Sequence, residues 1–318
     1  MKKLNILELF GGIGAIRKAL INLRVEFEVL DYVEVDKNAV RAYNLLYDED
    51  YIENSVVRYQ IETEKQIDIL IHGSPCQDFS IIGKKQGGEK GSGTRSSLLF
   101  ETIRIIEEMK EKPKWIIWEN VKGVLNEKFK DTFSFYIEEL KRLGYESKFK
   151  ILNAKDFGLP QNRERVFVIS FLGENKFDFE KLDKRRLEPI ENFLEKEVSN
   201  EYVVKQKSIL KILEKKIFNK SMNKKRAKVI KDYCYTISTK QVRLPNAGFV
   251  KLKDERYRYL TEKECFRLMG FSDEDFKKLE NEFKTEGKLS STLYKLAGNS
   301  IVVDVLIGIL KEIIEKEQ

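Results

Sequence analysis

The sequence contains few of the residues that build covalent or metal cross-links. Among its 318 residues are three cysteines, Cys76, Cys234 and Cys265, none of them in a CxxC pair, and a single histidine, His72. These numbers argue against a disulfide framework and against a structural zinc site built from cysteine and histidine. Such cysteine usage is typical of a reducing cytosol, so we expect a cytoplasmic protein.

Long hydrophobic runs are also missing. The apolar run at residues 4–9 is too short for a signal peptide, and the longest late run, Ile301–Leu310, is interrupted by Asp304. We therefore expect no contact with a membrane. The length allows one large domain or two ordinary ones, with a core that needs no covalent cross-link.

The positive charge is concentrated in one part of the chain. Overall, 59 basic residues face 52 acidic ones, which gives a net charge of +7. Residues 171–258 carry 23 basic and 13 acidic side chains, and Lys205–Lys231 alone holds 11 basic residues and one acid. A surface that binds a polyanion has this composition, but so does a solvated, lysine-rich helix face.

Up to about residue 170, short apolar runs alternate with longer amphipathic stretches. This alternation predicts an α/β fold around a mostly parallel sheet. The expected strands are Asn5–Leu9, Phe27–Val33, Ile67–His72, Trp115–Trp118, Glu146–Leu152 and Arg165–Phe171. The expected helices are Ile13–Leu23, Lys37–Leu46, Ser97–Glu111 and Asp131–Leu143, with Thr261–Met269 and Ile301–Ile314 later. Residues 172–258 read as charged, helix-prone sequence.

A glycine-rich turn follows the first expected strand. It contains Gly12 and Gly14 and opens a helix, and Glu34 ends the next strand 20 residues after Gly14. Glycines permit close approach of a ligand, and an acid at that strand end can bind ribose hydroxyls. Arg17 replaces the third glycine of the dinucleotide fingerprint, which suits a cofactor without ribose phosphate, such as S-adenosylmethionine. The alternative is an ordinary strand-to-helix turn.

Reactive side chains follow the later strands. Cys76 comes after the strand that ends at His72, in a loop where open parallel sheets bind ligands, and Glu119 follows the next strand. We expect Cys234 and Cys265 to fill the core instead. Arg163 and Arg165 stand two apart on an extended segment and so share one face, as in a ligand site or a surface ion-pair cluster.

Six motifs, in order, resemble those of the cytosine-5 DNA methyltransferases. They are Phe10-Gly11-Gly12, Pro75-Cys76-Gln77, Glu119-Asn120-Val121, Gln161-Asn162-Arg163-Glu164-Arg165, Arg258-Tyr259-Leu260-Thr261 with Glu264, and Gly298-Asn299-Ser300. The resemblance runs from residue 4 to about residue 310. It implies a Rossmann-like methyltransferase domain with a smaller target-recognition domain, divided as residues 1–171, 172–258 and 259–318.

The resemblance also implies a mechanism. Cys76 adds to carbon 6 of a cytosine flipped out of the duplex, and Glu119 holds the ring nitrogen. Arg165 contacts the base carbonyl, and Arg163 orders the surroundings of the nucleophile. The glycine-rich loop within residues 77–95 is the expected lid over the flipped base.

The implied ligands are S-adenosylmethionine, with no metal, and double-stranded DNA. The implied cofactor residues are Phe10, Gly12, Gly14, Glu34, Val35, Ser55, Pro75, Leu98, Asn299 and Ser300, and the implied DNA-binding residues are Gln77, Ser80, Lys224, Lys225, Arg226 and Thr236. We expect a monomer, with a separate restriction endonuclease as a possible partner.

Three other functions can be weighed against a DNA methyltransferase. A transfer-RNA methyltransferase uses the same cysteine chemistry, and the basic segment would serve either polymer. A zinc-dependent cytosine deaminase needs an HxE motif and a second cysteine after Pro75-Cys76, and both are missing. A non-catalytic DNA-binding regulator would not need to keep Cys76, Glu119, Arg163 and Arg165 together.

Overall fold

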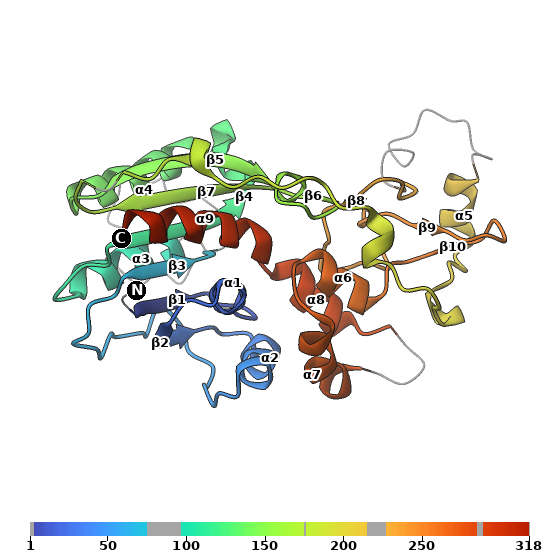
Figure 1. The fold of residues 1–318 in the computed structure, drawn as a ribbon, viewed down its shortest axis with the longest axis horizontal. Coiled ribbons are helices and arrows are strands. Elements are labelled where there is room, and N and C mark those ends of the chain that lie inside the picture. Colours follow the sequence, from blue (N-terminus) through green and yellow to red (C-terminus); the bar gives the residue numbers. More distant parts are fainter. Residues whose placement is uncertain (1–2, 75–96, 175, 215–226, 285–288, 318) are drawn as a thin grey trace, which may run out of the picture.

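A computed structural model describes residues 3–74, 97–174, 176–214, 227–284 and 289–317. Its centre is a six-stranded sheet in the order β2-β1-β3-β4-β7-β5 (Figure 1). The strands are β1 Leu4–Leu9, β2 Phe27–Val33, β3 Ile69–His72, β4 Trp115–Val121, β5 Glu146–Asn153 and β7 Glu164–Phe171. The first four strands run parallel, and β7 is antiparallel to both β4 and β5. The expected α/β fold with a mostly parallel sheet is confirmed.

Alternate side chains of the central strands enter two different cores. In β3, Ile69 and Ile71 belong to one hydrophobic cluster and Leu70 to the other. In β4, Trp118 lies in the same cluster as Leu70. Since successive side chains of a strand point to opposite faces, a strand covered on both sides must be apolar throughout. This is why the strands appear in the sequence as continuous apolar runs.

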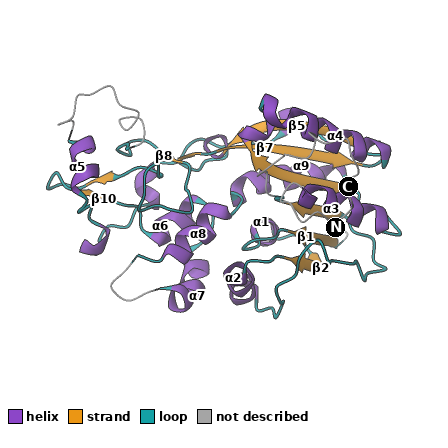
Figure 2. Cartoon of the chain, turned by 180° about the vertical axis from the view of Figure 1, so that it is seen from behind, coloured by secondary structure: helices purple, strands orange, loops and turns teal. Residues whose placement is uncertain are grey.

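Helices cover both faces of the sheet (Figures 1 and 2). They are α1 Ala15–Leu23, α2 Lys37–Tyr47, α3 Ser97–Glu108 and α4 Lys130–Arg142 in the first half of the chain. Helix α1 begins two residues later than predicted because Gly14 has a left-handed backbone with φ of 70°. Strand β4 extends three residues beyond the predicted end, through Glu119 to Val121, because it pairs with β7 over that length.

The expectation of helical structure in residues 172–258 was largely wrong. The described part of this region contains one α-helix, α5 Lys207–Leu213, and three two-residue strands. Strand β8 (Cys234–Tyr235) pairs with β6 (Gln161–Asn162), which precedes the region, and β9 (Val250–Lys251) pairs with β10 (Tyr257–Arg258). Short 3-10 turns make up most of the remaining regular structure. Lysine and glutamate favour helices only weakly, so tertiary contacts easily override them.

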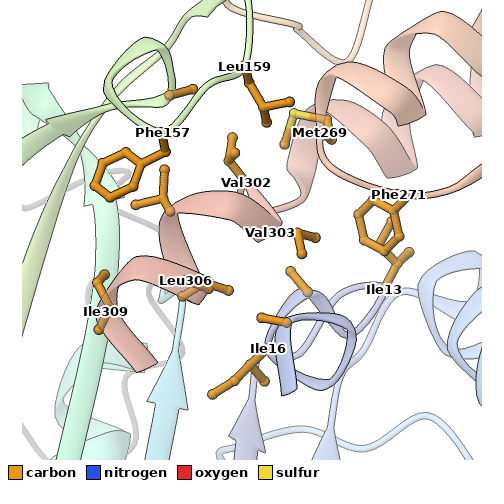
Figure 3. Close-up of a cluster of buried hydrophobic side chains, with 14 of the residues drawn as sticks. Ile13, Ile16, Phe157, Leu159, Met269, Phe271, Val302, Val303, Leu306 and Ile309 are labelled. Carbon is orange, nitrogen blue, oxygen red and sulfur yellow. The ribbon is translucent and has the colours of Figure 1, made fainter. Parts of the chain in front are cut away.

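The C-terminal helices connect the two ends of the molecule. They are α6 Glu262–Leu268, α7 Asp273–Phe283, α8 Ser291–Asn299 and α9 Val303–Lys316. Figure 3 shows α9 lying between α1 and Phe157, with Val303 and Leu306 directed toward Ile16. Gly308 permits this contact, since a Cβ atom there would lie 2.6 Å from the Phe157 ring. The last helix is therefore part of the core that β1 and α1 begin.

Helices α8 and α9 also pass a length and composition test for a membrane span. The test covers Ser291–Lys316, and 67% of its most apolar window is buried inside the fold. A buried core helix passes the same test, so this result alone assigns no location.

Candidate active site

The glycine-rich turn after β1 is held by tyrosines. The backbone of Phe10, Gly12 and Gly14 has positive φ, at 54°, 55° and 70°. The hydroxyl of Tyr32 donates to the Gly12 carbonyl at 2.7 Å, and that of Tyr47 donates to the Gly14 carbonyl at 2.7 Å. A Cβ atom on Gly14 would lie 2.5 Å from the Tyr47 ring. Glycine is therefore required there by both conformation and space.

Glu34 connects this turn to the end of β2. Its Oε2 accepts from the Gly12 amide at 3.2 Å, and its Oε1 accepts from the amides of Val35 and Asp36 at 2.8 and 2.9 Å. The Asn54 amide donates to the Glu34 carbonyl at 2.8 Å, which brings the adjoining Ser55 to the same edge. The acid predicted from the sequence thus lies beside the glycine turn.

A cleft of about 470 Å³ opens beyond the ends of β1 and β3. Of the predicted site residues, it is lined by Phe10, Gly12, Asn299, Ser300 and Glu119. Gly14, Glu34, Val35, Ser55 and Leu98 are not part of its lining.

Two of the glycines that line this cleft leave their backbone uncovered. Among the described residues, neither a Cβ atom on Gly12 nor one on Gly73 would meet another atom within 4 Å. At these two points the backbone itself faces open space, so a ligand can approach it closely. The backbone at both glycines is therefore open to a ligand bound in the cleft.

Glu119 and Arg165 form an ion pair at the same edge of the sheet. Strands β4 and β7 bring Arg165 Nε to 3.0 Å from Glu119 Oε1, with the two side chains 17% and 13% exposed. Burial raises the pKa of Glu119, while the positive charges of Arg165 and Arg163 oppose that rise. The carboxyl group is thereby shifted toward its protonated form, in which it can donate a hydrogen bond.

Arg163 lies deeper and binds the backbone of distant segments. Its Nη1 donates to the Ile237 carbonyl at 2.9 Å, and its Nη2 donates to the carbonyls of Gly298 and Ser300 at 3.0 and 2.9 Å. Burial, with a further contribution from Arg165, lowers the pKa of Arg163 to about 9. Arg163, just before β7, thus connects that strand to residues 237, 298 and 300, while its predicted role in ordering the surroundings of Cys76 stays a prediction, because Cys76 lies outside the described residues.

The segment at Thr236-Ile237 lies against the turn at residues 298–300, which lines the cleft. The Thr236 hydroxyl donates to the Asn162 carbonyl at 3.0 Å, beside the pairing of β6 with β8. A Cβ atom on Gly298 would lie 2.5 Å from the Ser238 backbone. Residues 236–238 therefore pack directly on the turn that carries Asn299 and Ser300.

Several predicted site residues lie outside the described residues. They are Pro75, Cys76, Gln77, Ser80, Lys224, Lys225 and Arg226. The residue just before them is held from β4, because Asn120 Nδ2 donates to the Ser74 carbonyl at 3.1 Å. Ser74, directly after the lining residue Gly73, is therefore held at the edge of the cleft.

The sequence interpretation missed two buried polar residues that line the cleft, Glu8 and His72. Glu8 is an acid in a strand whose other residues, apart from Asn5, are apolar, and its position just before the glycine turn was the available signal. His72 Nε2 lies 2.8 Å from the Tyr136 hydroxyl, and burial lowers the pKa of His72 to about 3. The imidazole is therefore neutral.

The whole chain matches known proteins. Residues 4–315 match the family described as C-5 cytosine-specific DNA methylase. The type II methyltransferase M2.ScrFI of Lactococcus lactis subsp. cremoris is 30% identical over 372 residues, covering 99% of this chain and 100% of that protein. The orphan methyltransferase M.SssI of Spiroplasma monobiae is 30% identical over 386 residues, covering 98% and 97%.

Solved structures share the fold. The Dnmt2 methyltransferase of S. pombe superposes with a TM-score of 0.80 at 19% identity, covering 99% of this chain and 100% of that one. A putative DNA modification methyltransferase encoded in an E. coli prophage gives a TM-score of 0.69 at 18% identity, covering 99% of each chain. With the profile match and the full-length relatives, this chain belongs to the C-5 cytosine-specific DNA methylase family and is a DNA (cytosine-5)-methyltransferase.

Proposed function

We propose that the protein methylates carbon 5 of a cytosine within a specific double-stranded DNA sequence, with S-adenosylmethionine as the methyl donor. The observation that carries this proposal is the Glu119–Arg165 pair beside a cleft whose floor is the bare backbone of Gly12 and Gly73. A base-binding acid and a cofactor cradle thus share one edge of the sheet. Cys76 follows Gly73 by three residues.

The proposed chemistry begins with the base. The Cys76 thiolate adds to carbon 6 of the cytosine, because carbon 5 alone is too weak a nucleophile. Glu119, protonated, donates to the ring nitrogen at position 3, so that the electrons of the new adduct reach carbon 5. Arg165 orients Glu119 and contacts the base carbonyl. Carbon 5, once it carries the methyl group, loses its hydrogen as a proton to a base, and the electrons of that bond expel the Cys76 thiolate from carbon 6, which releases the product.

The base must leave the duplex before this can happen. Stacked cytosines do not present carbon 6 to a side chain, so flipping is required. We propose that the loop within residues 77–95 closes over the flipped base. Gln77 and Ser80 would then contact the DNA.

We propose that the cofactor binds along the glycine turn. When bound, S-adenosylmethionine supplies an electrophilic methyl group on its sulfonium. Glu34 would hold the ribose hydroxyls, Gly12 and Gly14 would admit the methionine part, and Asn299 would close the cleft from the C-terminal side. The other proposed cofactor residues are Phe10, Val35, Ser55, Pro75, Leu98 and Ser300.

Residues 172–258 form the proposed target-recognition region, between the two parts of the catalytic domain at 1–171 and 259–318. Within it, Lys205–Lys231 supplies phosphate contacts, including Lys224, Lys225 and Arg226, and Thr236 lies where the region meets the catalytic domain. Relatives are named as type II and orphan methyltransferases of bacteria and phages. We therefore propose a restriction-modification or anti-restriction role for a cytoplasmic monomer, with any endonuclease acting separately.

Methyl transfer to purified polymers tests the proposal. Labelled cofactor is offered with unmethylated DNA and with transfer RNA in separate reactions, and bisulfite sequencing of DNA from expressing cells locates the modified cytosine. We expect label in DNA alone and one modified sequence. Label in transfer RNA alone would refute the DNA substrate.

Cysteine variants test the covalent step. Cys76→Ala is expected to abolish transfer while DNA binding persists. Cys265→Ala, in the buried face of α6, is the matched control and is expected to remain active. Transfer by Cys76→Ala at the wild-type rate would eliminate the thiolate mechanism.

A further inference from the structure

Two lysines lie over the rings of two neighbouring tyrosines where β6 pairs with β8. Lys155 Nζ is 4.4 Å from the centre of the Tyr233 ring, and Lys228 Nζ is 3.8 Å from that of Tyr235. The two ring centres are 6.0 Å apart. Cys234, between the tyrosines, is buried, so the rings share the other face of this extended segment. Two ammonium groups are therefore gathered on one face of the chain at residues 233–235.

The two lysines come from different parts of the chain. Lys155 belongs to the 3-10 turn Ala154–Asp156 after β5, in the catalytic part, whereas Lys228 precedes β8 within residues 172–258. Strands β6 and β8 lie between the central sheet and the part of the molecule that contains α5, β9 and β10 (Figure 1). The two cations are thus brought together where the catalytic part joins the proposed recognition region.

The tyrosine rings hold these lysines without cancelling their charge. Among the described residues, no carboxylate lies within ion-pair distance of Lys155 or Lys228. Lys150 in β5, by contrast, pairs with Glu180. The face of an aromatic ring attracts an ammonium group but carries no net charge, so the lysine keeps its full charge and has N–H donors to spare. Each ring therefore presents a cation that is ready for an anionic partner.

Strand β8 also lies next to the residues that hold the candidate active site. Asn162 is in register with Tyr235, and Arg163 Nη1 donates to the Ile237 carbonyl at 2.9 Å. Arg165, in the same run of sequence, forms the ion pair that the proposed function places at the base. A flipped cytosine stays attached to its own strand, so the DNA backbone comes close to this run of residues. Phosphate is therefore the anion that the two lysines are placed to meet.

We propose that Tyr233 and Tyr235 are positioning residues that hold Lys155 and Lys228 against the DNA backbone at this junction. One strand of a duplex carries a charge about every 3.4 Å along its axis, so cations on rings 6.0 Å apart can meet nearby phosphates of one strand. Such contacts fix the position of a protein on DNA without reading its sequence. The inference rests on the proposed function and extends it by naming a phosphate contact from the catalytic part, Lys155, and the rings that order both lysines.

Salt-dependent binding tests the phosphate contacts. The probe is a short fluorescent DNA duplex, titrated with the full chain by anisotropy between about 50 and 200 mM salt. The slope of log K against log salt changes by about 0.9 for each phosphate contact, so Lys155→Ala and Lys228→Ala should each flatten it by about 0.9 and the double variant by about 1.8. Lys110→Ala is the matched control and should keep the wild-type slope. Lys110 is exposed before the start of β4, whereas Glu119 lies near the end of that strand.

Tyrosine variants test the positioning. Leucine lacks the aromatic face, whereas phenylalanine keeps it and loses only the hydroxyl. A lysine that is ordered only on binding lowers affinity roughly two- to tenfold, so Tyr233→Leu should weaken DNA binding by that factor and Tyr233→Phe should not. In a Lys155→Ala background, Tyr233→Leu should have no further effect, because the lysine that it positions is gone. Tyr235 should behave in the same way toward Lys228.

Three results would overturn the inference. They are a salt slope unchanged in both lysine variants, a slope flattened equally by Lys110→Ala, and a Tyr233→Leu effect that persists in the Lys155→Ala background. Thermal unfolding shows whether each variant folds, and the lysine variants decide alone if the leucine variants do not. Failure of wild type to bind duplex DNA would instead refute the proposed function.

Discussion

The buried ion pair of Arg258 and Glu264 allows a quantitative stability prediction. The two side chains are 4% and 0% exposed, and Arg258 Nη1 and Nη2 donate to the two Glu264 oxygens at 2.8 and 2.7 Å. The amides of Thr261 and Glu195 each donate to the same carboxylate at 2.8 Å. Glu264 therefore neutralises a buried guanidinium and connects the start of α6 to the segment around residue 195.

Glu264→Gln keeps the size of the side chain and removes its charge. Breaking a buried pair leaves an uncompensated charge and costs about 3–5 kcal/mol. For a chain of this length, about 2 °C is lost per kcal/mol, so we expect the unfolding midpoint to fall by roughly 6–10 °C. Differential scanning calorimetry or urea unfolding measures the change.

The control is the exposed pair of Asp254 and Arg256, with side chains 53% and 54% exposed. Asp254→Asn should leave the midpoint unchanged, because water screens such pairs. If Glu264→Gln were no less stable than Asp254→Asn, the argument from burial would be wrong.

Three further predictions concern the site. Gly14→Ala should destabilise the fold strongly, because its Cβ would meet the Tyr47 ring, whereas Gly12→Ala should cost only about 1–2 kcal/mol of backbone strain and chiefly raise the KM for the cofactor. Thermal unfolding and steady-state kinetics separate the two, and equal effects on stability would contradict the geometry. Arg163→Lys should lower stability and kcat together, because one ammonium group cannot reach three carbonyls; an unchanged midpoint would show that those hydrogen bonds contribute little. Glu119→Gln should abolish transfer. Since burial raises the pKa of Glu119, the folded state gains stability from the protonated form and loses it as pH rises, so this variant should raise the midpoint at pH 8 and not at pH 4. A stabilisation at pH 4 equal to that at pH 8 would contradict the sign.

The central sheet could be predicted because its strands are covered on both faces. Burial on two sides leaves a continuous apolar run in the sequence, as in β3 and the first four residues of β4. Gly14 and Glu34 could be found because a left-handed turn favours glycine and because an acid 20 residues after Gly14, at the end of the next strand, fits the spacing of a nucleoside site. Local geometry restricted the residue type at each of these positions.

The partners of Arg163 and Glu8 could not be predicted in this way. Arg163 binds carbonyls that lie 74 and 135 residues further along the chain, and a carbonyl carries no trace of its partner in the sequence. Glu8 meets Tyr43, 35 residues later, only because α2 packs on that face of β1. The prediction of helices in residues 172–258 was wrong for a different reason. Their weak helical preference was overridden by pairing with distant strands.

Gln161 and Arg163 connect residue 237 to the turn at residues 298–300. Gln161 accepts from the Ile237 amide at 3.0 Å and donates to the Leu268 carbonyl at 2.8 Å, while Arg163 binds the Ile237 carbonyl and the turn at 298–300. One short segment thus fixes residue 237, in the proposed recognition region, against the turn that lines the cofactor cleft. Any shift of residue 237 must strain hydrogen bonds to that turn, because these groups are buried and have no water to replace them. Residue 237 and the turn at 298–300, which lines the cleft, are therefore held together by hydrogen bonds of the same short segment.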